Sequence, residues 1–301
     1  MLFRFVVTST VLYTEGAALQ FSGGSLPTGI TAGTTYYVYN VDGLTFGLLN
    51  SAGAEVGTSS SGSGSVSLIV DVPTAVNTFT VSDTSRFVLA FGCNDYGQST
   101  IDPMLIRWSA QDDIYNWTPD ATNQAGFVRV SHGSEIITTV QTRQEIVVFT
   151  DSSVYSLQYL GPPYVWAPQL LGDNISIISP NAAVIASGIV YWMGVDKFYS
   201  YDGRVQTLNC DLRRFIFQDL NQEQAAQVFC GTSEGFNEVW WFYPSANSTT
   251  IDKYVIYNYH EQIWYYCTMA RTAWLDSGLR NYPLAATYSR DRKSTRLNSS
   301  H

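Results

Sequence analysis

The sequence predicts an all-β fold: a partial β-propeller of four-stranded blades, preceded by a small N-terminal β-rich module. A similar strand pair recurs in Glu145–Leu157, Ile189–Tyr201 and Glu238–Tyr257, and aligning Tyr155 with Tyr199 gives a step of 44 residues. A repeat of about 40–50 residues built of strands is typical of propellers, with one sheet per step. Composition agrees, because 20 Tyr, 15 Phe, 8 Trp and 23 Gly favour strands joined by glycine-bearing turns.

Residues 1–71 are predicted to form the small β module. Thr34–Val41 and Leu44–Leu49 are rich in β-forming residues and flank Asp42-Gly43. This pattern predicts a hairpin, since both turn positions would need a positive φ. Gly57–Ser65 consists of glycine, serine and threonine and is expected to be a loop or the lip of a hairpin.

Residues 72–290 are predicted to hold the blades. Asp71-Val72-Pro73 marks the boundary, since proline interrupts a strand ladder, and the propeller-like part is expected to begin at Thr78. The first blade is expected to contain Arg86–Gly92 and Leu105–Ser109 and to be closed by Tyr115–Trp117. The strands expected in the next three blades are Ile136–Gln141, Glu145–Thr150, Val154–Leu160 and Tyr164–Leu170; Ala182–Ala186, Ile189–Met193, Phe198–Tyr201 and Arg204–Leu208; and Gln227–Gly231, Glu238–Tyr243, Tyr254–Tyr259 and Gln262–Thr268. Their aromatic runs indicate strands that are buried on both faces.

Two segments depart from this series. Asp211–Gln227 has a helical period, with Phe215, Phe217 and Leu220 on or near one face, and is expected to be a short helix between blades. Leu284–Ser289 is expected to be the opening strand of a fifth blade.

Residues 291–301 read DRKSTRLNSSH and resemble a translated sequencing adapter, so we exclude them from fold reasoning and expect the natural gene to continue past Arg290. The full chain carries a net charge of −9, and without the basic residues of this tail it is more acidic. An acidic surface repels phosphate backbones. A groove that grips DNA is therefore not expected, whereas a passage through which DNA slides is compatible with the charge.

Motifs for chemistry are sparse. His132 and His260 are the only histidines before the tail, and both lie in predicted turns, which does not favour a Ser-His-Asp or Cys-His system. Asp112-Asp113 is interpreted as a turn pair rather than a calcium or glycosidase site. The sequence therefore predicts no catalytic, cofactor-binding or metal-binding residue, and a protein that is not an enzyme.

Four cysteines are far apart in the sequence: Cys93, Cys210, Cys230 and Cys267. They lack the CxxC spacing of structural zinc sites, and free, buried thiols are expected. No apolar run reaches the roughly 18 residues of a membrane helix, so no membrane insertion is expected.

Five segments carry a resemblance to proteins of short-tailed bacteriophages (podoviruses): Leu26–Phe46, Phe91–Trp117, Thr142–Pro163, Tyr191–Gly203 and Gly235–Tyr243. The last four are similar to phrases of tail hub, nozzle and packaged-DNA-stabilising proteins, a family that includes tail tubular protein B. The first resembles a small β module of phage tail and baseplate proteins. Together these segments spread over most of residues 20–290.

The resemblance implies a structural virion protein, located in the tail after assembly in the host bacterial cytoplasm. It would form part of the nozzle or hub that continues and closes the DNA channel and retains packaged DNA until ejection. The implied partners are an adaptor below the portal, fibres or spikes, and further copies of the chain in a homo-hexamer. DNA would pass through without sequence-specific binding.

Two alternatives remain open at this point. A carbohydrate- or receptor-binding propeller tail protein, similar to a lectin, would use exposed Trp and Tyr rings such as Trp240. A propeller glycosidase would use a pair of carboxylates such as Asp112 and Asp113.

Overall fold

The computed structural model describes residues 3–4, 6–10, 12–13, 15–68, 72–96, 98–121, 123–276 and 283–287. These residues form strands, turns and only short helices, which confirms the all-β prediction. The chain divides into an N-terminal unit, Met1–Val72, and a C-terminal unit, Pro73–His301. The predicted boundary after residue 71 lies one residue away, and the predicted adapter segment 291–301 lies outside the described residues.

The N-terminal unit is built on a five-stranded sheet with the order β2-β5-β4-β3-β7. Its strands are β2 (Val7–Thr8), β3 (Ala18–Ser25), β4 (Thr35–Asp42), β5 (Thr45–Leu49) and β7 (Ser63–Leu68), and β1 (Phe3–Arg4) pairs separately with β6 (Gly57–Thr58). One face of the sheet buries a small core that includes Leu19, Phe21, Val38, Phe46 and Leu48. This core arises because inward residues alternate with exposed ones along β3 and β4.

The hairpin of β4 and β5 forms as predicted, but its turn lies one residue later. Asp42 pairs with Thr45 and still belongs to the ladder, so Gly43 and Leu44 make the turn. Gly43 has a φ of 56°, which glycine adopts without strain. The loop predicted over 57–65 is also partly wrong, because its two ends form β6 and the start of β7.

The C-terminal unit contains four antiparallel sheets of four strands each, and every sheet follows the order of the chain. Sheet 1 is β8 (Val76–Ser82), β9 (Phe87–Asn94), β10 (Ile101–Trp108) and β11 (Gly126–Arg129); sheet 2 is β12 (Ile136–Gln141), β13 (Glu145–Thr150), β14 (Ser153–Gly161) and β15 (Val165–Asp173); sheet 3 is β16 (Ala183–Ala186), β17 (Ile189–Met193), β18 (Phe198–Tyr201) and β19 (Val205–Leu208); sheet 4 is β20 (Phe229–Ser233), β21 (Glu238–Tyr243), β22 (Lys253–Asn258) and β23 (Ile263–Thr268). The strands predicted for the second to fourth blades are thereby confirmed, with small shifts at their ends.

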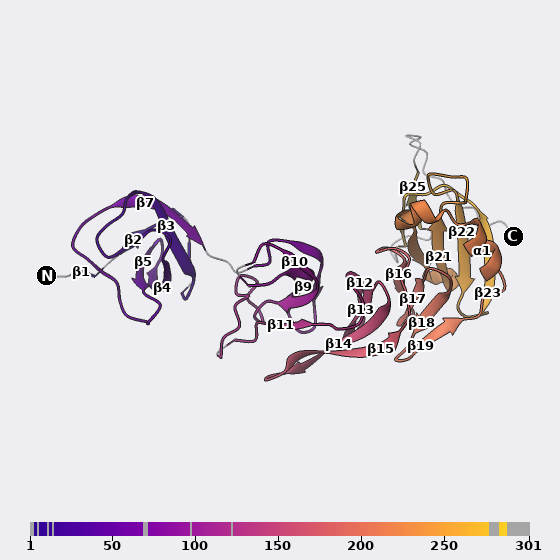
Figure 1. Cartoon of the computed structure of the whole chain (residues 1–301), viewed down its shortest axis with the longest axis horizontal. Coiled ribbons are helices and arrows are strands. Elements are labelled where there is room, and N and C mark those ends of the chain that lie inside the picture. The colour runs from indigo at the N-terminus through magenta and orange to yellow at the C-terminus, as the bar shows by residue number, and fades with distance from the viewer. Residues whose placement is uncertain are drawn as a thin grey trace. The chain divides into compact units, whose positions relative to one another are not determined.

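Successive sheets contact one another through their first strands. β8 lies against β12, β12 against β16, and β16 against β20, while β20 contacts β24 (Ala273–Leu275). Figure 1 shows the four sheets following one another in chain order. Meanders that meet along their first strands are typical of propeller blades, so the sheets are blade-like.

Two predicted elements need correction, and two strands were not predicted. Tyr115–Trp117 is not a strand, because Asp113 Oδ1 accepts the backbone N–H of Tyr115 and Trp117 Nε1 donates to the Ile114 carbonyl, which turns the chain. The fourth strand of sheet 1 is instead β11, and β8 was not predicted. In the last described sheet, β25 (Leu284–Ala286) pairs with the unpredicted β24 and is its second strand, while Ser289 lies outside the described residues.

The predicted connection between the third and fourth sheets holds helix α1 (Arg213–Asp219) and the 3₁₀ helix η1 (Gln222–Gln227). Its buried face differs from the prediction: Ile216 and Leu220 are buried, whereas Phe215 is 45% exposed. Within the described residues, no helix is both long and apolar enough to span a membrane.

Two apolar cores hold the blade-like sheets together, one between sheets 1 and 2 and one across sheets 2, 3 and 4. In β17 the four residues from Val190 to Met193 are all buried. Alternation is therefore lost in central strands, as expected for sheets covered on both faces.

Candidate functional site

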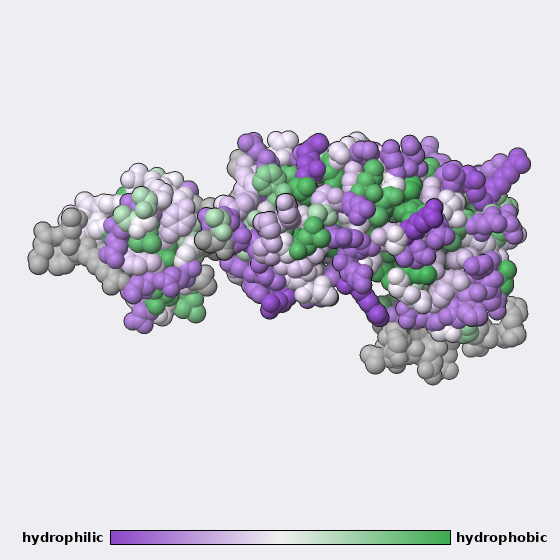
Figure 2. All heavy atoms as spheres, turned by 90° about the horizontal axis from the view of Figure 1, so that it is seen from below, coloured by the Kyte–Doolittle hydropathy of each residue, from purple (hydrophilic) through white to green (hydrophobic). Residues whose placement is uncertain are grey.

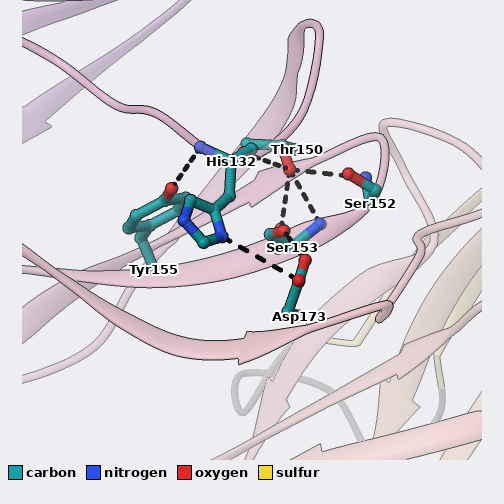
Figure 3. Close-up of polar contacts among 6 residues, drawn as sticks. All are labelled: His132, Thr150, Ser152, Ser153, Tyr155 and Asp173. Carbon is teal, nitrogen blue, oxygen red and sulfur yellow. Dashed lines mark hydrogen bonds and ion pairs between the residues drawn. The ribbon is translucent and has the colours of Figure 1, made fainter.

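His132 lies in the connection between β11 and β12, beside residues of sheet 2 (Figure 3). Its Nδ1 is 3.9 Å from Asp173 Oδ2, and Ser153 Oγ donates a hydrogen bond to Asp173 Oδ1 at 2.8 Å. The structure thus brings together a serine, a histidine and an aspartate, which are the residue types of a hydrolase triad.

The order of these groups does not fit nucleophilic catalysis. In a triad the histidine lies between serine and carboxylate and takes the serine proton. Here the carboxylate of Asp173 lies between Ser153 and His132, and Ser153 is fully buried. The serine hydroxyl therefore donates to the carboxylate of Asp173 instead of to the histidine, and it does not face a substrate.

Further contacts hold the connection between β11 and β12 against sheet 2. Tyr155 Oη accepts the backbone N–H of His132 at 2.7 Å, and Thr150 Oγ1 lies 3.3 Å from the His132 carbonyl oxygen. Gly133 has a φ of 111°, and a Cβ there would meet Thr150 Oγ1 at 2.6 Å. Only glycine fits this backbone. The contacts of His132 therefore anchor a turn, which is where the sequence analysis placed this residue.

Hydrogen bonds also set the charge of two carboxylates near this turn. The Ser153 hydroxyl and the Asn174 backbone N–H hold the pKa of Asp173 below its usual value. Burial tends to raise the pKa of Asp151, but the Ser134 hydroxyl and nearby backbone N–H groups overcome it and lower that pKa. Both carboxylates therefore act as fixed acceptors rather than proton donors.

The other sequence candidates also lie in turns. His260 is exposed, and its backbone N–H donates to Asn258 Oδ1 at 3.1 Å. Asp112 pairs with Arg86 at 3.0 Å, whereas Asp113 caps the turn of Tyr115. Asp112 and Asp113 thus lie in a turn, as expected. In the described part of the chain no group of His, Cys, Asp and Glu is arranged to hold a metal ion.

All four cysteines are free thiols, as predicted, but only Cys93 and Cys210 are buried. The expectation of burial is wrong for Cys267, which is exposed in the edge strand β23. Burial raises the pKa of the Cys93 and Cys210 thiols to about 11 each. They are therefore protonated at neutral pH and are poor nucleophiles.

Glu145 forms a second polar centre that the sequence did not indicate. It accepts hydrogen bonds from Ser156, from Gln158 Nε2 at 3.1 Å, and from Tyr201 Oη at 2.6 Å. Tyr201 belongs to β18, so this carboxylate links sheets 2 and 3. Burial would raise the pKa of Glu145, but the three hydrogen bonds prevail and hold it below its usual value.

A polar groove of about 1060 Å³ opens beside Glu145 at the turns of successive sheets. Its lining carries the acidic residues Asp83, Asp202 and Glu234 together with the basic Arg143. The groove contains no exposed aromatic platform, because its Tyr201 ring is only 5% exposed. Trp240, the sequence candidate for stacking on sugars, is partly buried and stacks on Tyr254 and Trp274, each at 4.9 Å.

Comparison with known proteins adds no relative: no protein-family model and no curated protein sequence matches this chain.

Replacing Glu145 by glutamine is expected to lower the free energy of unfolding at pH 7 by about 1 kcal/mol, since an amide accepts these hydrogen bonds more weakly than a carboxylate. The folded-state pKa of Glu145 is depressed, so its contribution is present above the unfolded pKa of about 4.3 and is lost as pH falls through the folded pKa. Urea unfolding at pH 7 and pH 3 measures both effects.

The matched control is Glu135→Gln, which changes an exposed glutamate directly before β12, at the other end of the β12–β13 hairpin. We expect this variant to unfold as the unchanged protein does at both pH values. A loss for Glu145→Gln that is equally large at pH 3 would show that the carboxylate charge is not what matters.

Proposed function

We propose that this chain is a structural virion protein of a bacteriophage tail. In this role it forms part of the nozzle or hub that continues and closes the DNA channel, and it retains packaged DNA until ejection. Its partners are other tail proteins and further copies of itself. The proposal rests on the likeness of four segments of the C-terminal unit to tail proteins of short-tailed phages.

The observation that carries the proposal is the serial architecture of these same segments. They supply strands to four blade-like sheets that meet through their first strands. Blades of this kind provide a rigid scaffold with many turns at each end, which suits a part that contacts several neighbours in an assembly.

Charge supports the same role. The chain carries 25 acidic and 16 basic residues, and hydrophilic residues cover much of the visible face of the C-terminal unit (Figure 2). An acidic protein does not hold DNA through counterion release. The wall of a channel through which DNA slides must likewise avoid binding the DNA tightly.

The His132 cluster gives no reason to prefer an enzyme. Its serine is buried and bonded to a carboxylate, and its other contacts fix a turn. Its contacts are explained by the need to fix the turn before β12. They are therefore consistent with a scaffold role for the C-terminal unit.

Virions made without the protein test the proposal. We expect a phage that carries an amber codon in this gene to assemble particles that lack the tip of the tail and lose their packaged DNA. A suppressor host should restore both. Electron microscopy and the DNA content of purified particles provide the measurements.

Other outcomes would decide differently. Particles that keep their DNA and have complete tails, yet fail to adsorb, would favour the receptor-binding alternative. Particles that remain infectious without the protein would overturn the proposal.

A further inference from the structure

A groove of about 720 Å³ lies in the N-terminal unit, between the two edge strands of its sheet. Val7 and Thr8 of β2 line one side, and Ser63, Gly64 and Val66 of β7 line the other. The strand order β2-β5-β4-β3-β7 places these strands at opposite ends of one sheet. The sheet therefore curls so that both of its edges reach the same groove.

Both edges are open in the described part of the unit. β2 pairs with β5 alone, through Val7 with Phe46 and Thr8 with Thr45, and β7 pairs with β3 alone. An edge strand presents N–H and C=O groups on its free side, which makes it a template for another strand. No lysine, glutamate or proline lies in β2 or β7 to block pairing. β2 has only two residues, so the six-residue strand β7 offers the longer edge.

The floor of the groove is apolar. Phe21 belongs to the core of the unit, and Leu26 and Val66 pack against that core. Gly64 lies close to this floor, because a Cβ at its position would meet Leu26 Cδ2 at 2.7 Å. If an extended strand occupied the groove, every second side chain of that strand would face the floor and extend the existing core.

The lining favours a peptide over other ligands. It contains no charged residue and no Asn or Gln, and its polar groups are the hydroxyls of serines and threonines. A phosphate would find no cation there. A sugar would find no carboxylate or amide, and the Phe21 ring is only 5% exposed for stacking. An extended backbone, by contrast, matches the free edges of β2 and β7 on its two sides.

We propose that this groove binds an extended, uncharged peptide strand of a partner polypeptide, which adds to the sheet between β2 and β7. Its backbone hydrogen-bonds to the strand edges, and alternate apolar side chains face Phe21, Leu26 and Val66. Charged side chains would lack counterions in this lining. The inference stands apart from the proposed tail function, because it rests on the N-terminal unit alone.

The test uses the full chain and a fluorescein-labelled probe, acetyl-Thr-Val-Thr-Val-Thr-Val-amide, with binding followed by fluorescence anisotropy. We expect saturable binding that falls at least about tenfold when alternate amides of the probe are N-methylated, because each lost backbone hydrogen bond weakens the pairing. Hydrogen exchange of β2 and β7 should slow in the complex, whereas exchange of the central strand β4 should not change.

Variants of two serines locate the site. Ser61 lines the groove and is exposed, whereas Ser65 is exposed but does not line it. Ser61→Trp is expected to weaken probe binding at least about tenfold by filling the groove, a loss of about 1.4 kcal/mol, and Ser65→Trp is expected to leave it unchanged. Absence of binding, equal binding of the N-methylated probe, or unchanged exchange at β2 and β7 would each overturn the proposal.

Discussion

Replacing Trp241 by alanine is expected to lower the free energy of unfolding of the C-terminal unit by about 3–5 kcal/mol. Trp241 is fully buried in the core of sheets 3 and 4. Its ring lies 5.0 Å from Phe198 and 6.0 Å from Trp264, centroid to centroid, and its Nε1 donates to the Ala182 carbonyl at 3.0 Å. The substitution would leave a large cavity where two sheets meet, and the Ala182 carbonyl would keep only its hydrogen bond from the Met193 backbone N–H at 3.2 Å.

Urea unfolding followed by far-UV circular dichroism measures this loss. The control is Tyr265→Ala, since Tyr265 lies in the same sheet but is 45% exposed; its cost is expected to stay below about 1 kcal/mol. Equal losses for the two variants would mean that sheets 3 and 4 do not share the core described above.

Phenylalanine substitutions separate the hydrogen bond from the packing. Trp192 is also fully buried, but its Nε1 has no hydrogen-bond partner among the described residues, whereas that of Trp241 has Ala182. Trp241→Phe is therefore expected to cost about 1 kcal/mol more than Trp192→Phe, because only Trp241→Phe removes a hydrogen bond.

The strands of sheets 2, 3 and 4 could be predicted from sequence because burial on both faces leaves continuous apolar runs between turn residues. In β21 the run from Val239 to Tyr243 contains four residues that are buried and one, Trp240, that is partly buried. A turn such as Asp202-Gly203 then marks the end of β18. Pattern and turn chemistry agree in these sheets, so local sequence suffices.

Sheet 1 was harder to predict, for a physical reason. In strand β8 apolar residues alternate with polar ones, and Phe79 is 71% exposed, so the strand has no continuous apolar run. Tyr115 and Trp117 have the composition of a strand, yet a side-chain cap at Asp113 turns the chain there. In this segment local side-chain hydrogen bonds prevail over the hydrogen bonds of a strand ladder, so the chain turns instead of forming a strand.

The polar centres could not be predicted, because their members are far apart in the sequence. His132 meets Tyr155 and Asp173 only after β15 returns beside β14. Glu145 and Tyr201 are joined only when sheets 2 and 3 stack. The interpretation of His132 as a turn residue was right, but its contacts depend on sheet order, which a single sequence does not display.

Replacing Arg107 by alanine is expected to lower the free energy of unfolding by about 3 kcal/mol, through a cavity and the loss of a charge-assisted hydrogen bond. Arg107 is a fully buried cation in β10. Its guanidinium carbon lies 3.9 Å from the Tyr96 ring centroid, and Nη1 donates to the Asn94 carbonyl at 3.1 Å. A buried charge is costly to desolvate, so its net value depends on these contacts.

Arg107→Met distinguishes the volume of this side chain from its charge. Methionine fills much of the same space without a charge to desolvate, and we expect it to recover more than half of the stability that alanine loses. Urea unfolding of both variants at pH 7 gives the comparison. If methionine is as destabilising as alanine, the guanidinium contacts with Tyr96 and Asn94 hold the β9–β10 loop in place, and sheet 1 depends on polar recognition where the other sheets depend on apolar packing.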